Sequence, residues 1–154
     1  MKIIITFLLV VLFTNITFAQ FARVDANIKK LNNNQFTIIH GDQPMFEMNS
    51  SAAMKLIKIG KKATVKLIVA LEDSTKVIMA HIVLCHIYFN VATFSGPKEF
   101  IANDRQVSKY FLGQEKGEGL ILSETKINGV YKIYIEEENL KKIIAFWKNK
   151  TSQK

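Results

Sequence analysis

The chain has 154 residues, a net charge of +8 and a hydrophobic content of 49%, so it is long and apolar enough to bury one core. Its single cysteine, Cys85, excludes an intramolecular disulfide, and the folded chain must therefore be held together by packing. All but two of its 21 basic residues are lysines. Arginine, rather than lysine, recognises bases and phosphates with paired hydrogen bonds. The scarcity of arginine therefore argues against sequence-specific nucleic-acid binding.

The N-terminal segment has the pattern of a cleavable export signal. Lys2 supplies a positive start, residues 3–13 are almost entirely apolar, and small residues precede an expected cleavage point after Ala19. The apolar run is too short to span a bilayer comfortably, which favours cleavage over retention as an anchor. We expect contact with a membrane only through this segment, if it stays uncleaved. We expect residues 1–19 to be removed and residues 20–154 to form a single exported domain, in the periplasm or outside the cell.

The beginning of the mature chain predicts a short helix, a strand and a loop. Residues 24–31 have helical composition, and residues 35–39 have the aromatic and β-branched composition of a strand. Three consecutive asparagines between them favour a turn. Residues 40–44 contain a glycine and a proline, and are therefore expected to form a loop.

Three consecutive helices are predicted before residue 90. A serine at position 50 or 51 is expected to cap the first helix, which Gly60 ends, and residues 63–71 form the second. An Asp-Ser pair then supplies a break and a new cap for the third helix, residues 75–89. Because this third helix is apolar nearly all round, we expect it to lie at the centre of the domain.

Part of this helical region, residues 54–88, resembles HEAT repeats. In these repeats one helix ends in Leu-x-x-Ile-Gly, and the next runs Ala-x-x-x-Leu-Ile-x-x-Leu-x-Asp. The matching residues are Leu56, Ile59, Gly60, Ala63, Leu67, Ile68, Leu71 and Asp73. The resemblance covers a single repeat and a fraction, and it implies a helical layer of the kind used as a scaffold for protein contacts.

The middle of the chain, residues 90–119, has weaker signals. Residues 95–97 (Ser-Gly-Pro) predict a loop, and residues 105–112 predict a short helix that Gly113 stops. The polar segment 114–118 is expected to lie on the surface.

The C-terminal part, residues 119–149, predicts a β-hairpin followed by an amphipathic helix. An Asn-Gly turn at residues 128–129 separates the strand residues 120–122 from the strand residues 130–135. The helix carries an apolar stripe at spacings of three and four, made of Leu140, Ile143, Ile144 and Trp147.

Two pairs of residues are candidates for chemistry. His81 and Cys85 are four positions apart on the predicted central helix, where they face the same point and suit a metal such as zinc. A structural zinc site needs four ligands, so we expect both side chains to be buried packing residues, with no cofactor. His40 and Asp42 are close enough in the loop to hold a histidine and a carboxylate together.

Lysines recur at spacings of three and four along the first two helices of the predicted helical region. They are Lys55, Lys58, Lys62 and Lys66, with Lys61 beside them. This pattern predicts a basic edge that would attract an acidic protein or an anionic envelope polymer. The alternative is the ordinary solvated face of amphipathic helices.

These patterns together predict an α+β fold, in which a HEAT-like helical layer, residues 50–89, packs against the C-terminal β-hairpin and its closing helix. The first functional hypothesis is an exported non-enzymatic protein that binds another macromolecule, such as an inhibitor or immunity-type protein of the envelope. The alternative is an envelope hydrolase or a metal-dependent enzyme that uses His81 and Cys85, or His40 and Asp42.

Overall fold

The computed structural model describes residues 21–102, 105–113 and 119–152. The predicted export signal, residues 1–19, and the polar segment 114–118 lie outside these described ranges. Within the described ranges, no helix combines the length and the apolar character needed to cross a membrane.

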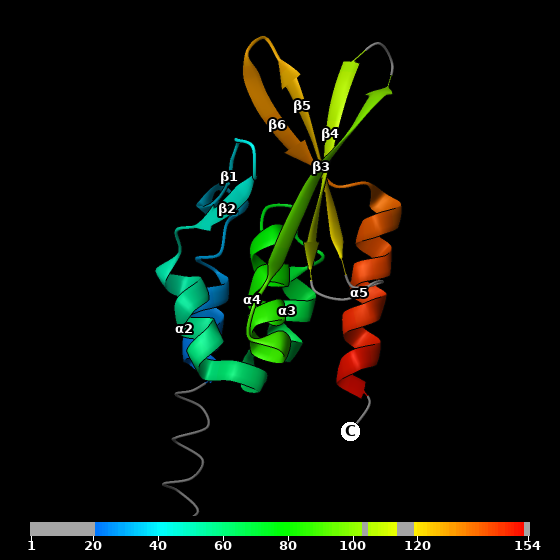
Figure 1. Ribbon diagram of the computed structural model, residues 1–154. Coiled ribbons are helices and arrows are strands. Elements are labelled where there is room, and N and C mark those ends of the chain that lie inside the picture. The colour runs from blue at the N-terminus through cyan, green and yellow to red at the C-terminus, as the bar shows by residue number, and fades with distance from the viewer. Residues whose placement is uncertain (1–20, 103–104, 114–118, 153–154) are drawn as a thin grey trace, which may run out of the picture.

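The fold is α+β, as predicted, with helices at one end and a twisted antiparallel sheet that extends beyond them (Figure 1). The described helices are α2 (Ser51–Ile59), α3 (Thr64–Ala70), α4 (Val77–Phe89) and α5 (Glu137–Ser152), and residues 21–28 are also helical. Two short 3-10 turns, η1 (Asn33–Gln35) and η2 (Gly60–Ala63), complete the helical part. A separate hairpin consists of β1 (Phe36–Ile39) and β2 (Met45–Met48). The four-stranded sheet has the order β3 (Thr93–Ala102), β4 (Arg105–Gly113), β5 (Leu120–Ile127), β6 (Val130–Tyr134).

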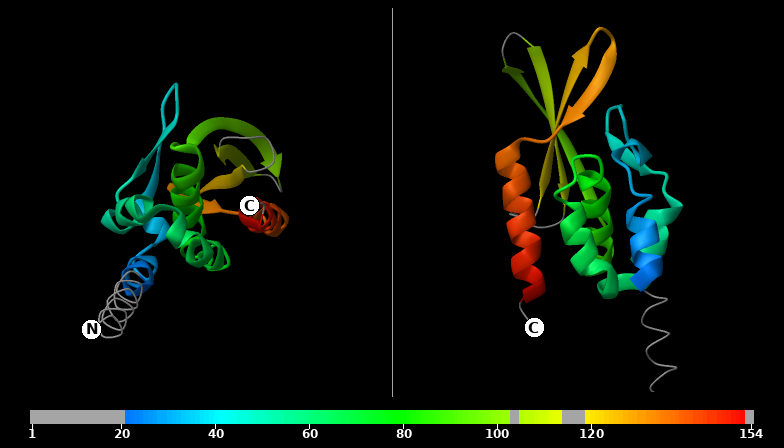
Figure 2. Two further views of the ribbon diagram at one scale, coloured as in Figure 1. Left: turned by 90° about the horizontal axis from the view of Figure 1, so that it is seen from below. Right: turned by 180° about the vertical axis from the view of Figure 1, so that it is seen from behind.

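Helix α4 occupies the centre of the domain, which confirms its predicted position. Residues 77–85 of this helix are all buried. Helices α2 and α3, strand β4 and turn η1 pack against it, and the view from below places it between α2 and the sheet (Figure 2). Because burial of each large aliphatic side chain stabilises a fold by about 1.5–3 kcal/mol, this one helix is a major source of stability.

The first predicted helix begins and ends where the sequence indicated. The hydroxyl of Ser50 accepts a hydrogen bond from the Ala53 N–H at 3.2 Å and so caps α2. Gly60 ends α2 with φ 69° and ψ −146°, a conformation that a side chain would strain. The chain then turns through η2 directly into α3.

The cap of α4 differs from the prediction. Asp73 accepts hydrogen bonds from the N–H and hydroxyl of Thr75 and thus closes a turn, and α4 starts only at Val77. The amide oxygen of Asn33, from η1, instead accepts the Ile78 N–H at 3.0 Å. A side chain 45 positions away therefore satisfies one of the backbone N–H groups that have no acceptor within the first turn of this helix.

Two predictions for the middle of the chain are wrong. Residues 95–97 lie inside strand β3, and residues 105–112 form β4 rather than a helix. A register shift between Ser95 and Lys98 accommodates the Gly-Pro pair within the strand. Strand β4 pairs with both β3 and β5, so its backbone hydrogen bonds are satisfied by distant segments that local helix signals do not reveal.

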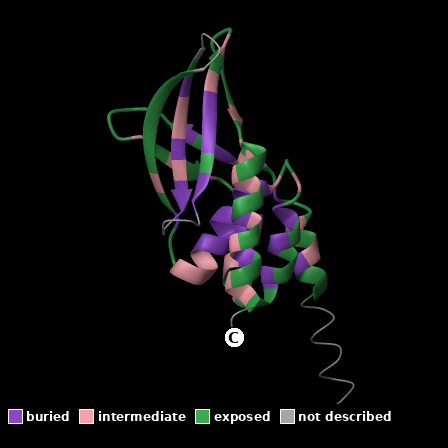
Figure 3. Ribbon diagram, turned by 90° about the vertical axis from the view of Figure 1, so that its right-hand side faces the viewer, coloured by how far each residue is buried: buried purple, intermediate pink, exposed green. Residues whose placement is uncertain are grey.

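The C-terminal hairpin and helix are confirmed. Asn128 and Gly129 both adopt positive φ, at 49° and 80°, which is the conformation of a tight two-residue hairpin turn. Helix α5 buries Ile143 and Trp147 in the core, and much of its outer side is exposed (Figure 3). Its lysines Lys141 and Lys142 lie on that solvated side and pair with glutamates one turn earlier.

Candidate functional site

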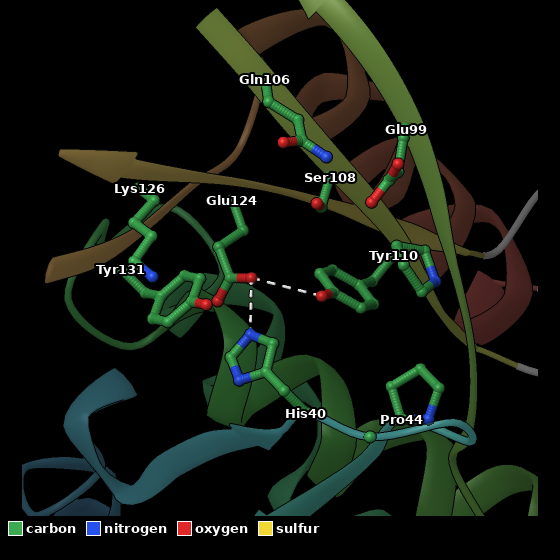
Figure 4. Close-up of a pocket in the computed structure, with 11 residues that line it drawn as sticks. His40, Pro44, Glu99, Gln106, Ser108, Tyr110, Glu124, Lys126 and Tyr131 are labelled. Carbon is green, nitrogen blue, oxygen red and sulfur yellow. Dashed lines mark hydrogen bonds and ion pairs between the residues drawn. The ribbon is translucent and has the colours of Figure 1, made fainter. Parts of the chain in front are cut away.

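A polar pocket of about 320 Å³ lies where the loop of the β1–β2 hairpin meets the four-stranded sheet (Figure 4). All four strands of the sheet contribute side chains to it. The main lining residues are His40 and Pro44 of the loop, Glu99 of β3, Gln106, Ser108 and Tyr110 of β4, Glu124 and Lys126 of β5, and Tyr131 of β6. We call this feature the polar pocket.

The register of the strands explains why these polar side chains converge. Residues directly opposite each other on antiparallel strands share a face of the sheet. Leu112 lies opposite Leu120, and both are buried in the core. Four residues from this pair on each strand, towards the pocket, Ser108 lies opposite Glu124 on the same face. This face therefore changes from apolar against the helices to polar in the pocket.

Glu124 is the buried charge at the base of the pocket, since only 4% of its surface is exposed. Its Oε2 atom accepts hydrogen bonds from His40 Nε2 at 2.8 Å and from the Tyr110 hydroxyl at 3.2 Å. Burial, together with the negative charge of Glu124, raises the pKa of Tyr110 to about 12. Tyr110 thus stays protonated and serves as a permanent donor to the carboxylate.

His40 ties the β1–β2 loop to the sheet. Its ring stacks on Tyr131, with ring centroids 4.4 Å apart, while its Nε2 binds Glu124. The Lys126 ammonium lies 5.1 Å from the centroid of the same Tyr131 ring. Through the stacking contact and the bond from Nε2, His40 links the β1–β2 loop to strands β5 and β6.

The structure pairs His40 with a different carboxylate from the one considered in the sequence. Asp42 is exposed and does not line the pocket, whereas Glu124 is 84 positions away along the chain. Sequence reasoning also missed Glu99, Tyr110 and Tyr131. The sequence does carry one signal for the pocket. Glu124 continues the alternation of inward-facing residues that Leu120 and Leu122 begin, and a charged residue at an inward-facing position is unusual.

His81 and Cys85 lie together, as their spacing predicted, and both are fully buried. The Trp147 indole donates to His81 Nδ1 at 3.1 Å, which leaves His81 Nε2 to donate to the Leu112 carbonyl at 2.9 Å. Burial lowers the pKa of His81 to about 4, so the ring is neutral near pH 7. Both ring nitrogens thus have protein partners, and the described residues include no group of three or more possible metal-ligating side chains.

The five lysines of the predicted basic edge, Lys55, Lys58, Lys61, Lys62 and Lys66, are all exposed on α2, η2 and α3. We call them the lysine surface. Lys66 pairs with Asp25 at 3.0 Å, and Lys61 lies 5.6 Å from the ring centroid of Tyr88. Asp25 belongs to the helical residues 21–28 and Tyr88 to α4, so the lysines border two different elements.

No protein-family model, curated protein or solved structure matches this chain. Two candidate sites are therefore defined by geometry alone. The polar pocket has a shaped cavity with a buried charge, and the lysine surface has a dense, predominantly positive charge.

Proposed function

We propose that this protein is an exported, non-enzymatic binding protein that recognises an acidic protein through the lysine surface. The observation that carries the proposal is the charge pattern of α2, η2 and α3. Between Glu47 and Glu72 the chain contains five exposed lysines and no acidic residue. Asp25, which pairs with Lys66, adds one carboxylate beside these lysines, and the surface stays predominantly basic. Such a surface attracts a partner of opposite charge and raises the rate of association.

Exposed apolar side chains favour a protein over a uniformly charged polymer as the partner. Met54, Val65 and Val69 are exposed on the same two helices, and 73% of Val65 is accessible. Each exposed ion pair contributes only about 0–1 kcal/mol, so affinity requires apolar contacts as well. A protein partner supplies both kinds of contact, whereas an anionic envelope polymer supplies mainly charge.

An inhibitor or immunity-type role in the envelope is the specific form of this proposal, with an acidic enzyme as the target. The HEAT-like pattern of residues 54–88 agrees with a contact scaffold, by analogy of fold. The enzyme alternative has less support at His81, because both ring nitrogens of this residue are occupied inside the core.

Charge reversal tests the proposal. The triple variant Lys55→Glu, Lys58→Glu, Lys62→Glu should lose capture of the partner from a native envelope extract, with the captured protein identified by mass spectrometry. A matched control, Lys132→Glu, Lys141→Glu, Lys142→Glu, changes the net charge by the same amount on exposed residues of β6 and α5. It should capture the partner as the wild type does.

Two results would contradict the proposal. Capture by the first triple variant at wild-type level would exclude the lysine surface. Equal loss in both variants would show that only the net charge of the chain matters. Circular dichroism of both variants should match the wild type, because all six lysines are exposed and the two ion pairs of α5 that the control loses are solvent-exposed and weak.

A further inference from the structure

We infer that the polar pocket is a second binding site, and that its ligand is a cationic ammonium or guanidinium group. The pocket lies against the β1–β2 loop, whereas η2 of the lysine surface lies at the opposite end of the helical part (Figure 1). The inference is therefore independent of the proposed function. It depends on the donors and acceptors that the pocket offers, on their charge, and on its size.

The pocket offers acceptors in excess of free donors. Glu99 and Glu124 are carboxylates, which only accept hydrogen bonds when ionised. The hydroxyl proton of Tyr110 is already donated to Glu124, so the lone pairs of its oxygen are what it can offer to a ligand. The Nε2 proton of His40 is committed to the same carboxylate. A ligand with several N–H donors would satisfy these groups.

The charge of the pocket points to the same ligand. Glu99 and Glu124 point into the cavity from different strands, with Ser108 between them (Figure 4). The positive charge of Lys126 lies on the other side, against the ring of Tyr131. Because Glu124 is almost fully removed from water, its attraction for a cation is stronger than that of an exposed carboxylate. A cation is thus favoured in a chain that is otherwise basic.

The size of the pocket limits the ligand to a small molecule or one side chain. A volume of about 320 Å³ is at the lower end of the range for ligand sites. The hydroxyl of Ser108 and the amide of Gln106 lie beside the carboxylates and can orient the N–H groups. The cation can come from a free small amine or from a lysine or arginine side chain of a partner protein.

Isothermal titration calorimetry on the mature chain tests the inference with three probes. Agmatine represents a free small guanidinium, acetyl-glycyl-arginyl-glycinamide represents a side chain on a peptide, and glutarate is an anion of similar size. We expect saturable binding with one site per chain for agmatine, the peptide or both, and no binding of glutarate. Binding of agmatine alone assigns the site to a small amine, and binding of the peptide alone assigns it to a partner's side chain.

Variants locate the binding in the pocket. Glu99→Gln should lower the affinity about tenfold, since a charge-assisted hydrogen bond is lost, and Glu99 is exposed, so the fold is kept. Glu47→Gln, on the exposed side of β2, removes the same charge outside the pocket and should bind as the wild type does. Lys126→Gln should strengthen binding, because a positive charge at the pocket is removed.

The inference is overturned if neither cation binds at millimolar concentration, or if glutarate binds in their place. It is also overturned if Glu99→Gln and Glu47→Gln change the affinity equally. Each of these results leaves the lysine surface untouched, because no residue of that surface lines the pocket.

Discussion

Replacing His81 by glutamine should flatten the dependence of stability on pH in the acid range. In the folded chain His81 is fully buried, accepts from Trp147 and donates to the Leu112 carbonyl. Burial lowers its pKa from 6.5 to about 4, because a charged ring would lose its hydration inside the core. A glutamine keeps a donor for Leu112 and has no proton to gain in this range.

The sign and size of the effect follow from the two pKa values. Above about pH 6.5 the ring is neutral in both the folded and unfolded chains, and His81 adds no pH dependence. As the pH falls towards 4, the unfolded chain binds a proton that the folded chain excludes, so stability is lost. A difference of this size between the two pKa values corresponds to about 3 kcal/mol between pH 7 and pH 4.

Urea denaturation of the wild type and His81→Gln at pH 7 and pH 4 measures this difference. At pH 7 the variant should be less stable by about 1–3 kcal/mol, because the Trp147 indole loses its acceptor. The wild type should then lose about 3 kcal/mol more than the variant on acidification. Equal losses in the two proteins would refute the assignment of His81 as a buried neutral histidine.

Three further changes test the packing, the C-terminal turn and the loop clamp. Leu84→Ala, at a fully buried position of α4, should lower the free energy of unfolding by about 2–5 kcal/mol in urea, and a loss below about 1 kcal/mol would contradict the central place of this helix. Gly129→Ala should cost about 1 kcal/mol in the same assay, because φ 80° strains a residue with a Cβ atom, whereas no loss would contradict the turn geometry. Tyr131→Leu should speed amide hydrogen exchange in the paired β1–β2 hairpin, since His40 loses its stacking partner, and unchanged exchange would show that the stacking does not hold the hairpin.

The elements that the sequence predicted correctly are those with strong local signals. Helix α4 was recognisable because its apolar residues surround the helix, and the β5–β6 hairpin because Asn128 and Gly129 suit its turn. Helix α5 was recognisable from the spacing of its buried residues Ile143 and Trp147. In each case the determining contacts lie within a few residues along the chain.

The elements that were missed depend on distant partners. The local composition of strand β4 predicts a helix, because its pairing with β3 and β5 leaves no signal within the segment itself. The cap of α4 comes from Asn33, a residue in a different element. The polar pocket also depends on residues far apart in the sequence, because it joins His40 to Glu124 across 84 positions. The residues of the lysine surface are close in sequence, so their pattern is visible there. The residues of the pocket are brought together only by the pairing of the strands and by the position of the β1–β2 loop.

Chemical footprinting of lysines tests the central claim, that the lysine surface binds an acidic partner, most directly. The free protein and its complex with the captured partner are treated briefly with an amine-acetylating reagent, and modification is measured by mass spectrometry. We predict that Lys55, Lys58 and Lys62 become protected in the complex, while Lys141 and Lys142 of α5 react as before. Protection of the α5 lysines with unchanged reactivity at the other three would contradict the claim.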